Sequence, residues 1–320
     1  MSAALDDPHA VQHLPQRPSI HPGQALDSYL EHVAAANHMT PFELANKITR
    51  AADTTRFLML SPTEATLRSL TALTGQSTEQ LKHATLKHYD GAGLDLSGLD
   101  PHNQSSYRTV AGRGWLPGNS SQLCPRCLKE TSARQLARRL PTTTVCTKHR
   151  RYLIGTCPGC DKPFRTAGHG FIRSVGAALV CGNPDGARGR HCRTELTTLA
   201  AKRADPACVG RQERYDRAMI DGAAVVFGHE TRAGAYHRAL RCLTVLFLHI
   251  ATAALSRETL PSWTRRLRQS LSAEATERSH RWGIAPPSDT IVRSRALTSA
   301  DHILGADHVE VAARLIAPPG

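Results

Sequence analysis

Seven of the nine cysteines lie between residues 124 and 192, at spacings that suit metal ligation. Cys124-Pro-Arg-Cys127 is followed, after 18 intervening residues, by Cys146-Thr-Lys-His149. Two short turns of this kind can close on one ion and supply three thiolates and one imidazole at tetrahedral positions, as in structural zinc sites. The spacing therefore predicts a zinc site made by Cys124, Cys127, Cys146 and His149.

A second cysteine set begins seven residues further along the chain, at Cys157-Pro-Gly-Cys160. Cys181 and Cys192 complete it through a longer loop. Since His191 stands next to Cys192, either side chain can be the fourth ligand, and the thiolate is the favoured choice. Both sets would be closed four-ligand sites with no position left for water. The sequence therefore predicts two structural zinc ions rather than a catalytic metal.

The other two cysteines, Cys208 and Cys242, have no partner at a ligand spacing and are expected to be ordinary buried thiols. The longest apolar stretch, Cys242–Leu255, is interrupted by His249. It is shorter than the roughly 20 residues that a membrane span needs, so we expect a buried helix there. The N-terminal residues lack the basic and apolar segments of a secretory signal. A cytoplasmic protein with reduced thiols and no membrane partner is expected.

The net charge of +13 is unevenly distributed along the chain. Residues 1–110 hold 8 Lys and Arg against 11 Asp and Glu, whereas residues 111–200 hold 15 against 4 and residues 201–320 hold 17 against 12. The cysteine-rich part is therefore the most basic one. A basic surface attracts polyanions, so nucleic acid is the first partner to consider. The alternative is a solvated basic face that serves solubility.

Helical periodicity and start signals dominate the N-terminal part. Apolar residues recur at helical spacing from Leu26, while Thr40-Pro41 and Ser77 with Gln80 are typical helix starts. Gly75 stands where a helix end favours a left-handed residue. The helices expected here are 26–37, 41–48, one that opens at Ser61 and ends at Gly75, and 78–87.

The last two of these helices are joined by residues 74–77 and have the pattern of a helix-turn-helix. In that arrangement residues 78–87 would be the recognition helix, with Lys82 and Lys87 available to phosphates or base edges. A helical hairpin with a glycine turn is equally a packing unit. A protein-binding or structural role therefore stays open beside DNA contact.

Basic side chains of the cysteine-rich part are further candidates for polyanion binding. Residues 132–140 have helical propensity and carry three arginines spaced to line part of one face. We expect a polyanion or an acidic protein surface to bind there. The candidate nucleic-acid-binding residues are Lys82, Lys87, Arg134, Arg138, Arg139, Arg150 and Arg151.

The chain as a whole is predicted to be mainly α-helical with small zinc-ribbon β elements. Residues 1–110 would form the helical, helix-turn-helix region, residues 111–200 the tandem zinc-ribbon module and residues 201–320 a C-terminal helical region. Residues 91–117, rich in glycine, are expected to be a linker with a buried foot. The C-terminal helices are expected at 208–221, 236–255, 264–275 and 307–316.

No motif of an enzyme is visible in the sequence. It lacks the phosphate-binding Gly-x-x-x-x-Gly-Lys-Ser/Thr, the metalloprotease His-Glu-x-x-His and the Gly-x-Ser-x-Gly of hydrolases. His32, His237 and His249 lie on expected helices without ligand spacing, so surface or packing roles are expected for them. The sequence favours a non-enzymatic protein over a metal-dependent nuclease.

Several stretches resemble the TniQ family of bacterial transposon proteins, which includes TnsD-like members. They are Leu14-Pro15-Gln16-Arg17-Pro18, His21-Pro22-Gly23-Gln24-Ala25-Leu26-Asp27-Ser28-Tyr29-Leu30, Ala36-Asn37-His38, the two knuckles of the first cysteine set with Leu128, Arg138-Arg139-Leu140-Pro141, and Cys157-Pro158-Gly159-Cys160. The resemblance covers roughly residues 14–160. It implies a helix-turn-helix region, tandem zinc ribbons and a bacterial, nucleoid-associated location.

The resemblance also implies a role in choosing where a transposon inserts. Proteins of this family link a target, either a DNA site or a guide-RNA effector complex on DNA, to a AAA+ ATPase regulator that recruits the transposase. A homodimer is compatible with this role. The alternative function is a stand-alone, zinc-containing helix-turn-helix regulator of transcription without a transposase partner.

Overall fold

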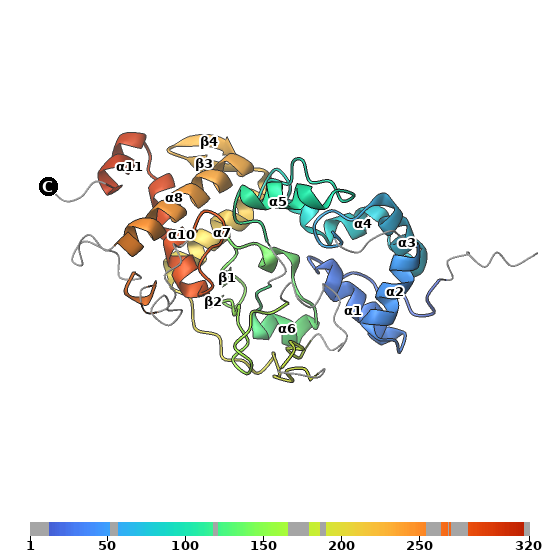
Figure 1. Ribbon diagram of the computed structural model, residues 1–320. Helices are drawn as coiled ribbons and strands as arrows, with labels where there is room; N and C mark the ends of the chain where they lie inside the picture. The colour runs from blue at the N-terminus through green and yellow to red at the C-terminus, as the bar shows by residue number, and fades with distance from the viewer. Residues whose placement is uncertain are drawn as a thin grey trace, which may run out of the picture.

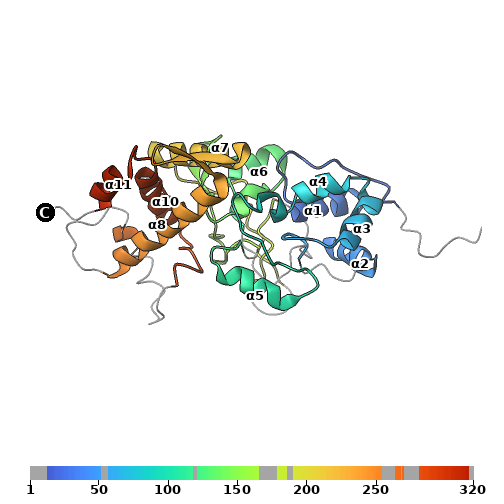
Figure 2. The same ribbon diagram turned by 90° about the horizontal axis from the view of Figure 1, so that it is seen from above.

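The computed structural model describes residues 13–51, 57–117, 121–165, 179–185, 190–253, 264–267, 269 and 281–316. Helices make up most of the regular structure, and two separate pairs of antiparallel strands accompany them. Figures 1 and 2 show the first four helices at one end of an elongated molecule and the last helices at the other, with the cysteine-rich part between them. This mainly helical architecture with small β elements confirms the predicted fold class.

Four helices form the N-terminal part: α1 (Leu26–Ala36), α2 (Pro41–Ala51), α3 (Glu64–Thr74) and α4 (Thr78–His83). Gly75 ends α3 in the left-handed conformation, with φ of 70°, and Ser77 and Gln80 form a capping box at α4, both as predicted. The start of α3 differs from the prediction. Thr63, not Ser61, is the N-cap, because its side chain accepts a hydrogen bond from the Thr66 amide.

Helix α4 is shorter than the predicted 78–87, because the backbone groups after it bond to other parts of the fold. The Ala84 carbonyl accepts from the Leu26 amide at 2.8 Å, and the Leu86 amide donates to the Met59 carbonyl at 2.8 Å. A 3₁₀ turn, η1 (Leu86–Tyr89), follows. The segment predicted as a recognition helix is therefore a six-residue helix and a separate turn.

Residues 91–117 are packed rather than linker-like. They contain helix α5 (Gln104–Gly112), and Leu94, Leu96 and Val110 are buried in the main hydrophobic cluster. The predicted buried foot is Trp115, which is 2% exposed and donates its indole N–H to the Trp282 carbonyl at 2.7 Å. This segment therefore packs against the C-terminal part of the chain.

The cysteine-rich part contains helix α6 (Pro125–Thr131), the 3₁₀ turn η2 (Leu136–Arg139) and the paired strands β1 (Val145–Cys146) and β2 (Arg151–Tyr152). The helix expected over 132–140 is wrong. Ser132 has a φ of 52° and ends α6, and the following backbone pairs with the chain before α1. The Ala25 amide donates to the Arg134 carbonyl, and the Leu136 amide to the Gly23 carbonyl, both at 2.8 Å.

The C-terminal part begins with helix α7 (Pro206–Asp221), close to the predicted 208–221. A hairpin of β3 (Ala223–Val226) and β4 (His229–Arg232) follows, and then the long helix α8 (Ala233–Ala253). The hairpin was not predicted. Its turn, Phe227-Gly228, has φ of 51° and 77°, the two positive values that a two-residue hairpin turn of type I′ requires.

Two more helices close the chain, α10 (Thr290–Leu304) and α11 (Val309–Ile316). Only α11 was predicted. Asp289 signals the start of α10, because its side chain accepts from the amides of Ile291 and Val292. Of the helix expected at 264–275, residues 264–267 and 269 are helical, and the rest lies outside the described residues.

Helix α8 is buried on one face only, so the expectation of a buried helix is half wrong. Leu240 and Leu248 are fully buried, whereas Leu246 and Ile250 are 45% and 44% exposed. Cys242 is exposed on the same helix, which corrects the expectation of a buried thiol, while Cys208 is buried as predicted. Among the described helices, none is long and apolar enough to span a membrane.

Buried polar side chains connect the cysteine-rich part to the C-terminal helices. The Thr142 hydroxyl donates to the Tyr215 hydroxyl at 2.7 Å, and the Tyr215 hydroxyl lies 3.0 Å from Nδ1 of His237. From α7, Arg211 donates to the Thr142 carbonyl, and Gln212 accepts from the Thr144 amide at 2.9 Å. These contacts cross the predicted boundary at residue 200, and the predicted division into three regions stays a prediction.

The burial of His237 predicts a pH-dependent stability. Burial, assisted by the charges of Arg241 and Arg238, lowers the pKa of His237 from 6.5 to about 4. Between these values the unfolded chain binds the proton and the folded chain does not, so the unfolding free energy falls as the pH is lowered. Urea unfolding measures the loss of unfolding free energy between pH 7.5 and pH 5. We expect this loss to be about 2 kcal/mol smaller in His237→Gln than in the wild type. His249→Gln, which changes an exposed histidine of α8, is the control, and equal pH dependence in all three proteins would contradict the assignment.

Candidate metal centres

The first cysteine set converges on one point, as its spacing predicted. Cys124 caps α6 and Cys127 lies in its first turn, while Cys146 ends β1 and His149 lies in the turn before β2. Their ligand atoms all lie within 4.8 Å of one another. Sγ of Cys127 is 3.5 Å from Sγ of Cys146 and 3.2 Å from Nδ1 of His149. The strand pair and the short helix thus present two knuckles to each other.

The surroundings of this first cluster orient and balance its ligands. Glu130 accepts from Nε2 of His149 at 2.9 Å, which turns Nδ1 toward the three sulfurs. Hydrogen bonds from the Cys127 and Cys146 thiols lower the pKa of the Cys124 thiol, and the thiolate is the form that ligates metal. Three thiolates around a divalent ion leave one negative charge. The buried Arg138 guanidinium lies 3.8 Å from Sγ of Cys146, where it can balance that charge.

The second set also converges. Sγ of Cys157 lies 3.8 Å from Sγ of Cys192, and Sγ of Cys160 lies 3.9 Å from Sγ of Cys181. The fourth member is Cys192 and not His191. Residues 181–183 bond to residues 192–194 as an extended pair, and neighbouring residues of extended chain point to opposite sides. A Cys192 side chain that faces the other thiols therefore turns His191 away from them.

Close packing in the second knuckle demands a glycine. A Cβ atom at Gly159 would lie 2.0 Å from Oγ1 of Thr194, and Thr194 in turn lies 3.1 Å from Sγ of Cys192. Nδ2 of the Asn183 side chain donates to Sγ of Cys160 at 3.6 Å. The ligand positions are therefore fixed by neighbours as well as by the knuckle itself.

Both clusters fit zinc. Zinc–sulfur bonds of roughly 2.3 Å in a tetrahedron separate the sulfurs by roughly 3.8 Å, and the sulfur–sulfur distances in the structure are 3.5, 3.8 and 3.9 Å. Cys124, Cys127, Cys146 and His149 would hold one ion, and Cys157, Cys160, Cys181 and Cys192 the other. Each cluster offers four protein ligands, which suits a structural ion.

Three of the predicted nucleic-acid-binding arginines are buried, which corrects the expectation of an exposed basic face. Arg134, Arg138 and Arg139 are 4%, 9% and 3% exposed. Arg134 lies over the ring of Phe164, with 5.6 Å between its guanidinium carbon and the ring centroid. Arg138 lies beside Cys146 of the first cluster, and Arg139 forms an ion pair with Asp27. The pattern along residues 132–140 could not reveal Phe164 and Asp27 as partners, since both are distant in sequence.

A buried ion cluster, formed by Asp27, Glu31, Arg134, Arg139 and Arg165, joins α1 to the cysteine-rich part. Arg165 donates to both Asp27 and Glu31 at 2.5 Å, and Arg139 also donates to Asp27. Burial alone would raise the pKa of Asp27, but the guanidinium charges of Arg139 and Arg165 hold it below its ordinary value. Sequence analysis missed Arg165 and both acids. The i,i+4 spacing of Asp27 and Glu31 on one helix face was the available signal.

The remaining predicted basic residues are differently placed. Lys82 forms an ion pair with Glu64 at 2.9 Å, and Lys87 one with Asp90 at 2.6 Å. Arg150 is exposed and Arg151 half-buried at β2. Neither of these two has an ion pair among the residues that the structure describes.

Lys202 and Arg203, which sequence analysis missed, lie beside Arg150 and Arg151. The Tyr152 amide donates to the Lys202 carbonyl at 3.0 Å, and Arg151 and Arg203 are paired across an antiparallel bridge. We call Arg150, Arg151, Lys202 and Arg203 the basic ribbon. Like charges directly opposite each other repel, so an anion beside the ribbon would be stabilising.

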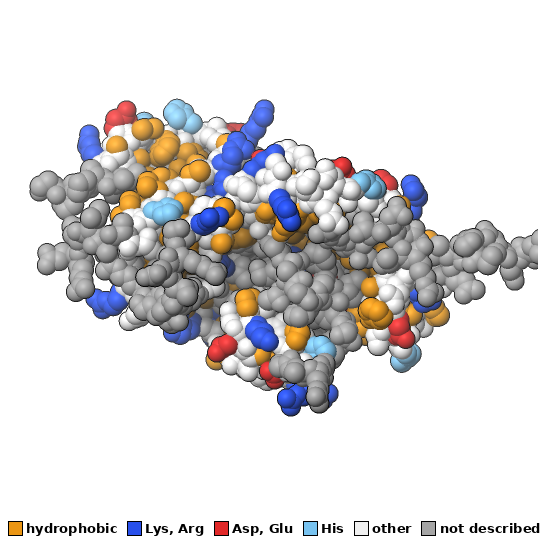
Figure 3. Space-filling model, in the orientation of Figure 1, with side chains coloured by type: hydrophobic (Ala, Val, Ile, Leu, Met, Phe, Trp, Pro, Cys, Tyr) orange, Lys and Arg blue, Asp and Glu red, His pale blue; other side chains and the backbone are white. Residues whose placement is uncertain are grey.

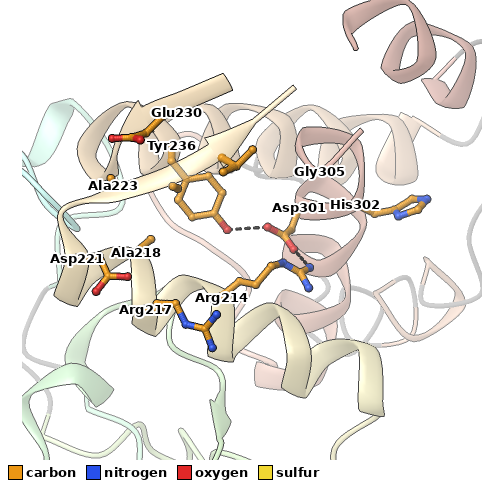
Figure 4. A pocket seen from close by; sticks show the side chains of 12 residues that line it. Arg214, Arg217, Ala218, Asp221, Ala223, Glu230, Tyr236, Asp301, His302 and Gly305 are labelled. Atoms are coloured by element: carbon orange, nitrogen blue, oxygen red, sulfur yellow. Dashed lines mark hydrogen bonds and ion pairs between the residues drawn. The ribbon is translucent and has the colours of Figure 1, made fainter. Parts of the chain in front are cut away.

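A cavity of about 710 Å³ lies among α7, the β3–β4 hairpin and α10. Figure 4 shows Asp301 at its inner wall, where the carboxylate accepts from the Tyr236 hydroxyl at 2.6 Å and pairs with Arg214. Arg217, Asp221 and Glu230 line the same cavity. The Asp301 carboxylate is thus held by structural partners.

Comparison with known proteins gives one family. Among curated proteins, none matches the chain. Residues 15–153 match the family model described as TniQ, a range that begins ahead of α1 and ends just after β2. The matched range contains the N-terminal helices, α6 and all four ligands of the first cluster. This agrees with the resemblance found in the sequence: residues 15–153 of the chain are similar to the TniQ family.

Proposed function

We propose that the protein is a target-selection adaptor of a transposon. In this role it links target DNA, or a guide-RNA effector complex on DNA, to a AAA+ transposition regulator and so to the transposase. The family is associated with transposition, and the match over residues 15–153 is the observation that carries the proposal. The proposed role is non-enzymatic.

The two zinc ions would be structural in this proposal. Zinc supplies ligand bonds that hold together a module with little apolar mass of its own. The first cluster ties α6 to β1 and β2, and the second ties residues 157–160 to the extended pair of residues 181–183 and 192–194. Both clusters flank the chain segments that carry the basic ribbon. Fixed positions for Arg150 and Arg203 are what recognition of a regular phosphate backbone needs.

We assign nucleic-acid contact to the basic ribbon rather than to residues 134–139. Arg150, Lys202 and Arg203 are exposed. Asp205, the nearest acid along the chain, is engaged by Arg295 at 3.1 Å and by the Tyr152 hydroxyl at 2.8 Å. The ribbon therefore keeps its positive charge, and each phosphate that it neutralises would release counterions.

The triple variant Arg150→Ala, Lys202→Ala, Arg203→Ala tests this assignment. We expect weaker DNA binding and a salt dependence whose log–log slope is smaller by about 2 to 3, since each lost phosphate contact removes roughly 0.9. Fluorescence anisotropy with a labelled duplex from 50 to 200 mM salt measures both. The control replaces three exposed cations of α2, α3 and α5, namely Lys47, Arg68 and Arg108, by alanine. Equal slopes for the two triple variants would refute the assignment.

An adaptor also needs a surface for its protein partner, and we place this surface at the C-terminal end. Ile220, Val225, Leu246 and Ile250 are 83%, 66%, 45% and 44% exposed. Figure 3 shows hydrophobic side chains gathered over the end of the molecule that holds α8 and the β3–β4 hairpin. Exposed apolar groups in such number favour a protein interface over a free surface.

Reconstitution separates the adaptor from the stand-alone regulator. The zinc-loaded protein is incubated with a labelled duplex and the AAA+ ATPase of the same element, in the presence of ATP. An adaptor is expected to retain both partners in one complex on a size-exclusion column. DNA binding without ATPase retention would favour the regulator, and magnesium-dependent cleavage of the duplex would favour a nuclease.

A further inference from the structure

One guanidinium of the buried ion cluster is only partly satisfied. Arg139 is 3% exposed and donates through Nη2 to Asp27. Its Nε and Nη1 groups have no hydrogen-bond partner in the part of the chain that the structure describes. A buried donor without an acceptor is costly, and more so when it carries charge, so native structures seldom leave one without a ligand, an ion or water.

Arg139 lines a cavity of about 280 Å³. A second buried arginine, Arg293, lines the same cavity and is 6% exposed. Its nitrogens donate to the carbonyls of Pro141 and Pro287 and to Oε1 of Gln122, all of which are neutral acceptors. Burial lowers the pKa of Arg293 to about 10, a sign that its charge is poorly compensated.

The rest of the cavity wall suits an anion. Three hydroxyl side chains, Ser121, Thr156 and Ser288, line it and can donate hydrogen bonds. Neither Asp nor Glu is among the described residues that line it. Two guanidinium groups and several hydroxyls around one small space form a donor set for an oxyanion that offers several acceptors. We call this space the arginine cavity.

We propose that the arginine cavity is a binding site for a phosphate group. A volume of about 280 Å³ lies just below the usual range of pockets for drug-sized ligands, so the cavity suits one oxyanion group rather than a whole nucleotide. The phosphate is either free in solution or part of a nucleic-acid backbone. This site is distinct from the basic ribbon and does not depend on the adaptor role.

Bound phosphate would connect three parts of the fold. Ser121 and Thr156 belong to the cysteine-rich part, Arg293 and Ser288 to the C-terminal part, and Arg139 reaches α1 through Asp27. A ligand that binds only the folded state stabilises it by mass action. Saturable thermal stabilisation by phosphate is therefore the expected signature.

The test introduces a carboxylate at the cavity by mutation. Ala285 is exposed and lines the cavity, so Ala285→Glu can place a negative charge at its mouth without disturbing the buried arginines. Ala285→Gln is the control of equal size without the charge. The zinc-loaded full-length proteins are titrated with inorganic phosphate at constant pH and ionic strength, with chloride as the replaced anion. Isothermal calorimetry measures binding, and calorimetric unfolding measures stability.

Binding of one phosphate per chain to the wild type and to Ala285→Gln, with at least tenfold weaker binding to Ala285→Glu, would support the proposal. In chloride alone, Ala285→Glu should also have a higher melting temperature than Ala285→Gln, because its carboxylate would compensate the buried arginines. No saturable phosphate binding to the wild type, or equal binding to the two variants, would overturn it.

A labelled duplex identifies the source of the phosphate. If inorganic phosphate displaces the duplex and Ala285→Glu weakens duplex binding relative to Ala285→Gln, the phosphate belongs to nucleic acid. If phosphate binds with no effect on the duplex, the site takes a free ion. If the basic-ribbon variant loses duplex binding but still binds phosphate, the basic ribbon and the arginine cavity are independent sites.

Discussion

Replacing Cys127 by serine is expected to lower the zinc content from two ions to one per chain and to unfold α6, β1 and β2, which the first cluster holds together. Cys127 contributes one of four candidate ligands whose ligand atoms lie within 4.8 Å of one another. When one ligand is lost, a structural metal site loses most of its contribution to the folding free energy. We expect a loss of more than about 4 kcal/mol in unfolding free energy. Metal analysis by mass spectrometry and urea unfolding measure the two effects.

Cys242→Ser provides the control for this experiment. Cys242 is exposed on α8 and belongs to neither cluster, so its replacement should leave both ions and the stability unchanged. A Cys127→Ser protein that retained two zinc ions and the melting temperature of the wild type would refute the assignment of the first cluster. Loss of both ions would mean that the second cluster depends on the first for its folding.

Replacing Asp27 by asparagine is the second change with a large expected effect. It would leave Arg139 and Arg165 buried with Glu31 as the only remaining acid of the cluster. Removal of one partner from a buried ion pair costs about 3–5 kcal/mol, because the other charge remains buried and uncompensated. Urea unfolding at pH 7 measures this loss. The control Asp221→Asn removes an exposed carboxylate and should cost less than about 0.5 kcal/mol.

The same pair of variants gives a pH signature. The pKa of Asp27 is lower in the folded chain than its ordinary value of 3.8. Its stabilising contribution is therefore complete above about pH 4 and is lost as the pH falls through the folded-state pKa. Asp27→Asn should show a smaller loss of stability below pH 4 than the wild type and Asp221→Asn. A loss at pH 7 below about 1 kcal/mol in Asp27→Asn would contradict the ionised state of the cluster.

Local patterns predicted those features whose cause lies within a few residues. The first cluster and the Cys157–Cys160 half of the second follow from knuckle spacing, and the capping box at Ser77 and the left-handed end at Gly75 follow from backbone chemistry at those positions. The fourth ligand of the second cluster needed the structure, because the pairing of residues 181–183 with 192–194 decides which neighbour faces the thiols. The similarity to the TniQ family could also be predicted from the sequence, since each of the motifs that carry it is a continuous stretch of residues.

Features that depend on distant partners were mispredicted. Arg139 and Arg165 are 112 and 138 residues away from Asp27, so nothing near the arginines indicated that they would be buried. The helix expected over 132–140 is absent because its backbone bonds to residues 23–25 instead. Residues 91–117 looked like a linker because their buried contacts, such as Trp115 with Trp282, are made 167 residues away.

The ion pairs between α1 and residues far along the chain have a consequence for synthesis on the ribosome. Helix α1 emerges with Asp27 and Glu31 on the face that will be buried, while Arg139 and Arg165 have not yet been made. Until both arginines arrive, the helix must keep its acids in water and cannot settle against its final neighbours. Helix α1 is therefore expected to complete its packing no earlier than the cysteine-rich part, so a shortage of zinc during translation would leave α1 without its final neighbours as well.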